Sequence, residues 1–176
     1  MRLPLGYGDM LFGLSYLREG NPAKAIAVLQ PRLESTEREI GRRSMVAAML
    51  AGTLAAALFL RDSPQQALET LADRLDVVER GGMPDSIILA YRTLAEIALR
   101  RGEEARALEI LVAQRDLGIT RDLPRLRLGS LAEQVRLHAT RGRVQSAAEL
   151  LTEMAAMRPV FAQPIYRALA PYFERR

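Results

Sequence analysis

A helix, a turn and a second helix that recur about every 40 residues constrain the fold of this chain more than any other feature. Gly102 and Gly142 stand 40 positions apart, and so do Ala107 and Ala147. Each glycine separates two segments whose apolar residues follow a helical spacing. Such a repeat is typical of an α-solenoid, in which one helix pair cannot bury its apolar face without its neighbours.

The same period extends towards the N-terminus of the chain. Ala67 lies 40 residues before Ala107, and Ala25 lies 42 residues before Ala67. The turns that precede these alanines centre on Asp62 and Gly20. The pattern therefore predicts four stacked helix pairs, with small residues at the positions where two helices approach most closely.

We expect an all-α chain of about nine helices in a right-handed superhelix, because no alternation of apolar and polar residues indicates a strand. All repeats are assigned to a single domain over residues 1–176. The expected units cover residues 6–36, 37–80, 84–118 and 124–158, with a terminal helix at 164–175. The expected helices cover residues 6–18, 22–34, 37–60, 64–79, 85–101, 103–117, 125–141, 144–157 and 165–174.

The composition offers few residues from which an active site could be built. The chain has no cysteine and one histidine, His138, so disulfides, thiolate metal sites and the usual nucleophilic pairs lack their parts. The single lysine, Lys24, is followed by Ala25, so the chain contains no P-loop. We therefore expect no enzyme, no cofactor and no metal site. We expect His138 to be a packed side chain with one ring nitrogen hydrogen-bonded.

The charged residues predict a solvated surface more than a nucleic-acid interface. The net charge is +4, and carboxylates interrupt the arginines of the last two units. Those arginines are Arg121, Arg125, Arg127, Arg136, Arg141 and Arg143. No aromatic residues accompany them as a stacking platform, so we expect no direct contact with nucleic acid. The acidic residues on the helices have arginines at nearby spacings and are expected to form ion pairs on exposed faces.

Residues 44–60 form a run without any charge, which is at the lower length limit for a membrane span. The run is rich in alanine, contains Gly52 and Thr53, and stands where the repeat requires a helix. A helix that is apolar on every side is also what the centre of a core requires. We therefore expect a buried helix, no membrane contact and a cytoplasmic protein.

The first expected helix, residues 6–18, is apolar on nearly every side. Its large apolar residues are Tyr7, Met10, Leu11, Phe12, Leu14, Tyr16 and Leu17. The ends of a solenoid need a polar outer face if they are to remain in water. We therefore expect this helix to be covered by an earlier repeat or by a second copy of the chain, which would make a homo-oligomer.

Two segments resemble bacterial LuxR-family transcriptional regulators of the MalT-like type. The first is RLDVVER at 74–80 with AYRTLA at 90–95, and the second is LPRL at 123–126 with LAEQVRLH at 131–138. Regulators of this family combine an ATPase, a tetratricopeptide-like superhelix and a LuxR helix-turn-helix. The resemblance implies that this chain is a tetratricopeptide-like sensor region. It carries neither the ATPase motifs nor the helix-turn-helix.

Two functions remain open from the sequence. The resemblance implies a signal-sensing or protein-interaction module of a MalT-like regulator, which receives a protein or small-molecule inducer. The other function is a free-standing tetratricopeptide scaffold that binds a protein or peptide. The two differ in whether the reading frame continues into an ATPase on one side and a helix-turn-helix on the other.

The concave face, lined by the first helix of each pair, is the expected binding surface. If Ala95 and its counterpart one repeat later pack between helices, the register turns Arg92 and Glu96 towards the groove. In the next unit the same register selects Ala132 and Arg136. Two arginines and a carboxylate could orient a polar ligand or an acidic peptide. The alternative is that these residues pair with each other across adjacent helices and bind no ligand.

Overall fold

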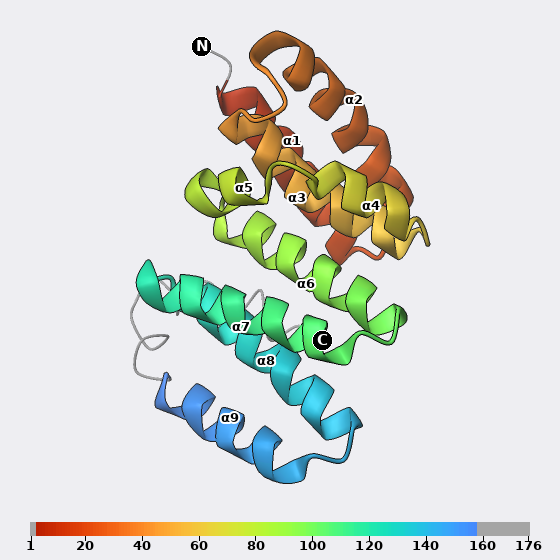
Figure 1. The fold of residues 1–176 in the computed structure, drawn as a ribbon. Helices are drawn as coiled ribbons and strands as arrows, with labels where there is room; N and C mark the ends of the chain where they lie inside the picture. Colours follow the sequence, from red (N-terminus) through yellow and green to blue (C-terminus); the bar gives the residue numbers. More distant parts are fainter. Residues whose placement is uncertain (1–2, 158–176) are drawn as a thin grey trace. The chain divides into compact units, whose positions relative to one another are not determined.

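The computed structural model describes residues 3–157, and within them it contains nine helices and no strand (Figure 1). The prediction of an all-α chain is confirmed. The helices are α1 (Leu3–Arg18), α2 (Pro22–Ile40), α3 (Met45–Leu60), α4 (Pro64–Leu71), α5 (Leu75–Gly81), α6 (Pro84–Arg100), α7 (Glu104–Thr120), α8 (Pro124–Thr140) and α9 (Val144–Ala156). The terminal helix expected at 165–174 lies outside the described residues.

The chain divides into two compact units, of which the first covers Met1–Ile110 and the second begins at Leu111. The boundary falls inside α7. The first unit contains α1 to α6 with the start of α7, and the described part of the second contains the rest of α7 with α8 and α9. The assignment of all repeats to one domain stays a prediction.

The turn between α1 and α2 shows how the repeat is built locally. Gly20 has a φ of 72°, a left-handed conformation that glycine adopts without steric cost. The Asn21 side chain then accepts a hydrogen bond from the backbone N–H of Lys24 at 3.1 Å, and Pro22 stands in the first turn. Gly102 and Gly142 have φ values of 76° and 70° in the corresponding turns, so the predicted glycine turns are confirmed.

The boundary between α2 and α3 differs from the prediction. The sequence predicts a helix over 37–60, whereas α2 continues to Ile40 and α3 begins at Met45. Pro31 lies inside α2 without ending it, on an exposed part of the helix. The interruption is at Gly41, whose φ of 92° is incompatible with a helix, and Ser44 caps α3 by accepting from the Ala47 N–H at 3.3 Å.

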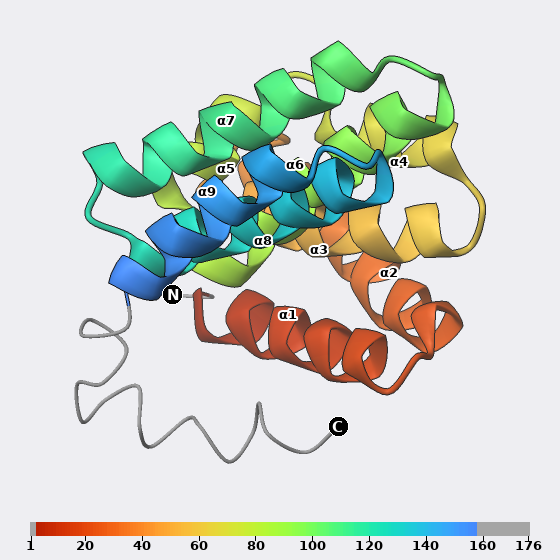
Figure 2. The same cartoon turned by 90° about the horizontal axis from the view of Figure 1, so that it is seen from below.

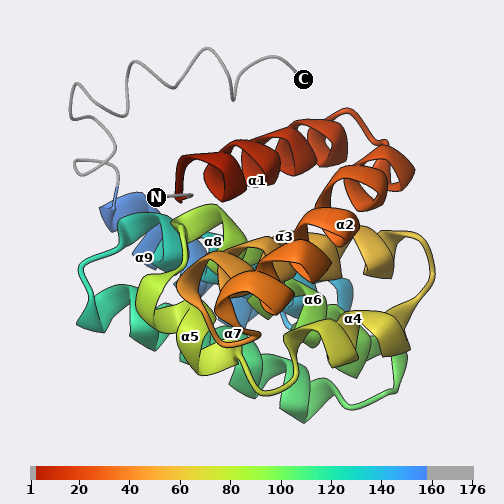
Figure 3. The same cartoon turned by 90° about the horizontal axis from the view of Figure 1, so that it is seen from above.

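Helix α3 is the centre of the first unit, as Figures 2 and 3 show. Every residue from Val46 to Phe59 is buried, and the helix packs against α1, α2, α4 and α6. Small residues allow the neighbouring helices to approach α3 closely. At Gly52 the approach leaves no room for a side chain, because a Cβ built there would lie 2.6 Å from the Ser86 carbonyl oxygen on α6. The expected buried helix is therefore confirmed. Among residues 3–157, no helix has the length and hydrophobicity to cross a membrane.

The predicted helix over 64–79 is wrong, because the chain breaks between α4 and α5. Asp73 has a φ of 60°, which interrupts the helix after Leu71. The break is held from the α2–α3 turn: Arg42 Nη2 donates to the carbonyl oxygens of Glu69 at 2.8 Å and Ala72 at 3.1 Å. These carbonyls at the end of α4 lack intrahelical partners, so an arginine there supplies both hydrogen bonds and a favourable charge.

The second unit is held by a buried polar cluster as well as by apolar packing. Gln114 on α7 donates to the Leu126 carbonyl on α8 at 2.9 Å. Ser130 donates to the Leu111 carbonyl and accepts from the Gln134 amide at 2.9 Å. All three polar side chains are buried, so these bonds satisfy groups that water cannot reach and fix α7 against α8.

Candidate functional site

A pocket of about 270 Å³ opens in the first unit between α2, α3 and α4. We call it the Arg74 pocket. Its lining residues are Gln30, Leu33, Glu34, Glu37, Arg42, Leu54, Leu58, Gln66, Glu69, Thr70 and Arg74. It is thus formed where two second helices of neighbouring pairs, α2 and α4, meet beside the first helix α3. This position differs from the concave face that the sequence predicts as the binding surface.

Burial divides the lining into a floor and a rim. The side chains of Leu33, Leu54, Leu58 and Arg74 are buried and form the floor. The rim consists of exposed polar side chains, which are Gln30, Glu34, Arg42, Gln66 and Glu69. The pocket therefore has an apolar floor with one buried cation, and a polar rim that carries two carboxylates.

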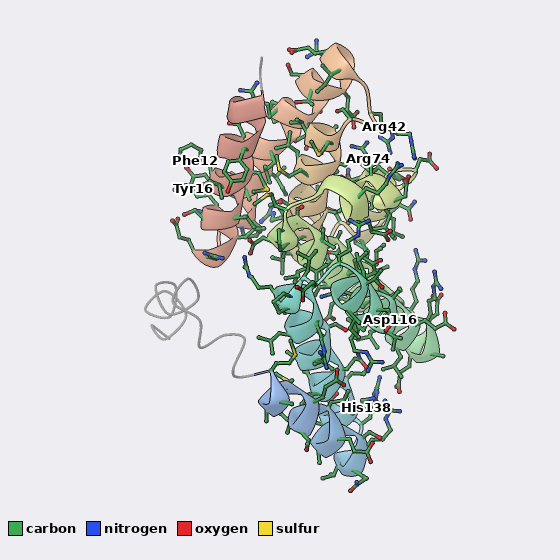
Figure 4. All side chains as sticks on the ribbon, turned by 90° about the vertical axis from the view of Figure 1, so that its left-hand side faces the viewer. Phe12, Tyr16, Arg42, Arg74, Asp116 and His138 are labelled. Carbon is green, nitrogen blue, oxygen red and sulfur yellow. The ribbon has the colours of Figure 1, made fainter. Side chains whose placement is uncertain are left out.

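The break between α4 and α5 places Arg74 in this floor. Residue 74 immediately precedes α5, and the left-handed Asp73 turns the chain back towards α2. Arg43 fixes the same break from the α2–α3 turn, since it donates to the Asp73 carbonyl and to Asp76 Oδ2, the latter at 2.7 Å. Arg42 and Arg74 lie close together in Figure 4. Their proximity is a product of this break, which the helical pattern alone does not reveal.

The floor contains one buried charged side chain. The Arg74 side chain is 0% exposed, and its Nη2 forms an ion pair with Glu37. Its Nε and Nη1 are buried and have no hydrogen-bond partner in the structure. Burial lowers the pKa of Arg74 below its ordinary value, and the hydrogen bond to Glu37 opposes this effect. The guanidinium is thus an incompletely compensated charge.

Glu37 is shared between two guanidinium groups. Besides the pair with Arg74, its Oε1 lies 3.6 Å from Arg42 Nη1. One carboxylate therefore faces two cations, the buried guanidinium of Arg74 in the floor and the exposed guanidinium of Arg42 at the rim, so the charge of Arg74 is only partly compensated. An uncompensated charge of this kind favours an anionic ligand, because the attraction is strong where water is excluded.

The residues that the sequence assigns to the groove are on the expected helices. Arg92 is exposed and Glu96 is half-buried on α6 in the first unit. Arg136 is exposed on α8 in the second unit, and its Nε donates to Glu133 Oε2 of the same helix at 2.8 Å. The structure thus brings Arg92 and Glu96 together, one turn apart on one helix. Their role in binding stays a prediction.

The outer side of α1 exposes several large apolar side chains. Tyr7 is 40%, Leu11 is 45% and Phe12 is 61% exposed, whereas Met10 and Leu14 are buried on the other side of the helix. Figures 2 and 3 show α1 at the edge of the first unit, with α2 and α3 on one side of it. What the outer side packs against stays a prediction, with an earlier repeat or a second copy as the expected occupants.

The histidine has the role predicted for it. His138 is half-buried, and its Nδ1 accepts a hydrogen bond from Arg143 Nε at 2.9 Å. Tyr91 is buried and donates to Glu79 at 2.6 Å, so it serves packing, whereas Tyr166 lies outside the described residues. Within residues 3–157 no group of His, Asp and Glu side chains could hold a metal ion.

Comparison with known proteins agrees with the fold. The chain is similar to the crystal structure of nearly identical TPR-like repeats from a kinesin light chain-like protein of Podosopora anserina. The TM-score is 0.65 and the identity 19%, and the match covers 99% of this chain and 90% of the other. The chain has a TPR-like fold. No protein-family model and no curated protein matches it, so the comparison shows the tetratricopeptide-like fold alone.

Sequence reasoning missed the Arg74 pocket. Arg74 stands inside what the helical pattern predicts to be a continuous helix, where an arginine is normally exposed. The signal that could have found it is the pair Arg42 and Arg43 directly before an uncharged helix. In the structure these two arginines donate to carbonyl oxygens at the end of α4 and to Asp76.

Proposed function

We propose that this chain is a non-catalytic protein-interaction scaffold that binds a peptide segment of a partner along the first helices of its pairs. The observation that carries the proposal is the arrangement on α6. Arg92 and Glu96 reach solvent from a helix whose neighbouring residues Tyr91, Ala95 and Ala98 are buried. Polar groups on a rigid, well-packed helix are pre-organised for binding and lose little entropy when a partner docks.

The chemistry of this surface favours an acidic peptide. A guanidinium recognises a carboxylate through two parallel hydrogen bonds, which gives both energy and orientation. Arg92 on α6 can supply such a contact, and Glu96 on the same helix can accept a backbone or side-chain N–H of the same peptide. Arg136 on α8 can supply a contact of the same kind within the second unit. Extended peptides present alternating side chains and free backbone groups, so they suit polar groups that are spaced by one turn along a rigid helix.

A displayed library of random peptides tests this proposal on the full chain. We expect the selected peptides to be enriched in Asp and Glu beside apolar residues. The variant R92A/R136A should weaken binding of a selected peptide at least tenfold, because both side chains are exposed and their loss leaves the core intact. R106A is the matched control, since Arg106 is exposed on the second helix α7 and pairs with Glu109 at 2.9 Å. Equal binding by the double variant and R106A would refute the groove.

A finer proposal is that the scaffold is the sensor segment of a MalT-like LuxR-family regulator, which would act in the cytoplasm. The support is the resemblance of residues 74–95 and 123–138, together with a TPR-like fold. In that setting the groove receives a protein or small-molecule inducer, and binding shifts a population between resting and active arrangements. Sequencing the flanking reading frame tests it. An ATPase upstream and a helix-turn-helix downstream support the regulator, and their absence leaves the free-standing scaffold.

We also propose that α1 joins two copies of the chain. Its exposed residues Leu11 and Phe12 stand 42 positions before Thr53 and Leu54 of α3, which are buried by the neighbouring helices. The corresponding face of the next repeat is therefore built to receive a helix. Two identical α1 faces can meet by a twofold axis, which needs no second kind of surface.

A further inference from the structure

The Arg74 pocket is separate from the peptide surface. Arg92 and Glu96 are not among its lining residues, and its walls come from α2, α3 and α4. Its volume of about 270 Å³ is close to the lower end of small-molecule pockets. A pocket of this volume has room for a small metabolite but not for a folded peptide.

The two guanidinium groups of the pocket favour a ligand carboxylate. Two guanidinium groups, those of Arg42 and Arg74, share the single carboxylate of Glu37. Two nitrogens of Arg74 are also buried without a hydrogen-bond partner. A ligand carboxylate beside them would supply a second counter-charge. Arg42 is 44% exposed and can meet the ligand directly, while Arg74 attracts it from below.

The rim carboxylates favour a cation next to the ligand carboxylate, since Arg42 Nη2 lies 2.8 Å from the Glu69 carbonyl oxygen. Glu34 and Glu69 are exposed carboxylates on α2 and α4, one on each side of the opening. Each accepts a hydrogen bond from a glutamine four residues earlier, Gln30 at 3.2 Å and Gln65 at 3.0 Å. These bonds hold the carboxylates in place at the opening. An ammonium group between two oriented carboxylates gains from both of them.

The floor of the pocket offers apolar contacts to the ligand side chain. Leu33, Leu54 and Leu58 are buried and present an apolar wall to the pocket. A ligand side chain without polar atoms would be removed from water against this wall. We propose that the Arg74 pocket binds a free α-amino acid with an apolar side chain. The ligand carboxylate faces Arg42 and Arg74, and its ammonium group faces the rim.

Isothermal titration of the full chain with L-leucine tests the proposal directly. Two analogues separate the two charged ends of the ligand. N-acetyl-L-leucine keeps the carboxylate and imitates the last residue of a peptide, whereas L-leucinamide keeps the ammonium group and lacks the carboxylate. We expect L-leucine to bind and both analogues to bind at least tenfold more weakly. D-leucine is a further probe, because a pocket with three separate contacts discriminates between the two enantiomers.

Two variants assign the binding to this pocket. E34Q/E69Q removes the rim charges at exposed positions. It should weaken the binding of L-leucine at least tenfold and leave the weak binding of N-acetyl-L-leucine unchanged. R74K removes the buried guanidinium and should abolish binding, provided that its circular dichroism is that of the wild type. The matched control is E109Q/E149Q, which removes two exposed carboxylates from α7 and α9 and should bind as the wild type does.

The outcomes separate the proposal from its alternatives. Absence of heat with L-leucine at millimolar concentration overturns it, and so does an E34Q/E69Q variant that binds like the control. Binding of N-acetyl-L-leucine as tight as that of L-leucine overturns the free amino acid and assigns the carboxylate to a peptide C-terminus. No residue is shared with the groove variants R92A and R136A, so failure here leaves the peptide-binding proposal standing, and the reverse is also true.

Discussion

The close approach of α3 and α6 makes Gly52→Ala a sensitive test of the packing in the first unit. A Cβ at this position would lie 2.6 Å from the Ser86 carbonyl oxygen and 3.2 Å from the Ser86 Cβ. The nearest atom belongs to the backbone of a helix, so it cannot move aside as a side chain would. The two helices must separate, and α3 is surrounded by packed neighbours.

The expected magnitude follows from two opposing terms. Overpacking of a core by one methyl group costs about 1–3 kcal/mol of unfolding free energy. Replacement of a mid-helix glycine by alanine recovers about 1 kcal/mol through helix propensity. Because the contact is with backbone, we place the overpacking term at its upper end and expect a net loss of about 2 kcal/mol.

Urea unfolding followed by circular dichroism measures this change, provided that the slope of the transition stays constant. Gly8→Ala is the matched control, because Gly8 lies in α1 and a Cβ there has no atom within 4 Å. This variant should gain up to about 1 kcal/mol from propensity alone. A G52A protein as stable as G8A would refute the tight packing of α3 on α6.

Three further variants test other parts of the account. Ser130→Ala removes the acceptor of the buried Gln134 amide, which should cost about 1–3 kcal/mol in a urea titration. A hydrogen bond from Arg43 holds the pKa of Asp76 below its usual 3.8. The ionised Asp76 therefore stabilises the folded chain above that pH, and this stabilisation is lost as the pH falls through the lowered pKa. Asp76→Asn should therefore lower the urea midpoint at neutral pH and match the wild type in strong acid. Phe12→Glu should convert a dimer to a monomer in sedimentation velocity, and a wild-type monomer would refute pairing through α1.

The repeat could be predicted from the sequence because its signals are local. Glycine marks three of the four turns, at Gly20, Gly102 and Gly142, since the left-handed conformation there is costly for most other residues. Asp62 adopts it in the remaining turn, with a φ of 59°. The apolar run before Leu60 likewise predicts a helix at the centre of a core. Helices α6, α8 and α9 begin within a residue of their predicted starts for the same reason.

The two wrong boundaries have different physical causes: the left-handed Gly41 interrupts the chain locally between α2 and α3, whereas long-range contacts hold the break between α4 and α5. The break after Leu71 depends on Arg42, which lies almost 30 residues earlier and bonds to the end of α4. Helical periodicity carries no information about a partner so far away in the sequence. The burial of Arg74 follows from that break, so the helical pattern could not predict the pocket either. Arg92 and Glu96, by contrast, share a face because helical register alone places them there.

The most direct test of the central claim is hydrogen–deuterium exchange of the full chain with and without a peptide selected from the displayed library. Bound peptide shields backbone amides and the helices beneath it from exchange. The account predicts slower exchange in the first helices of the pairs, with α6 (Pro84–Arg100) affected most. Protection confined to α7 and α9, with α6 unchanged, would contradict a scaffold that binds its partner along the first helices.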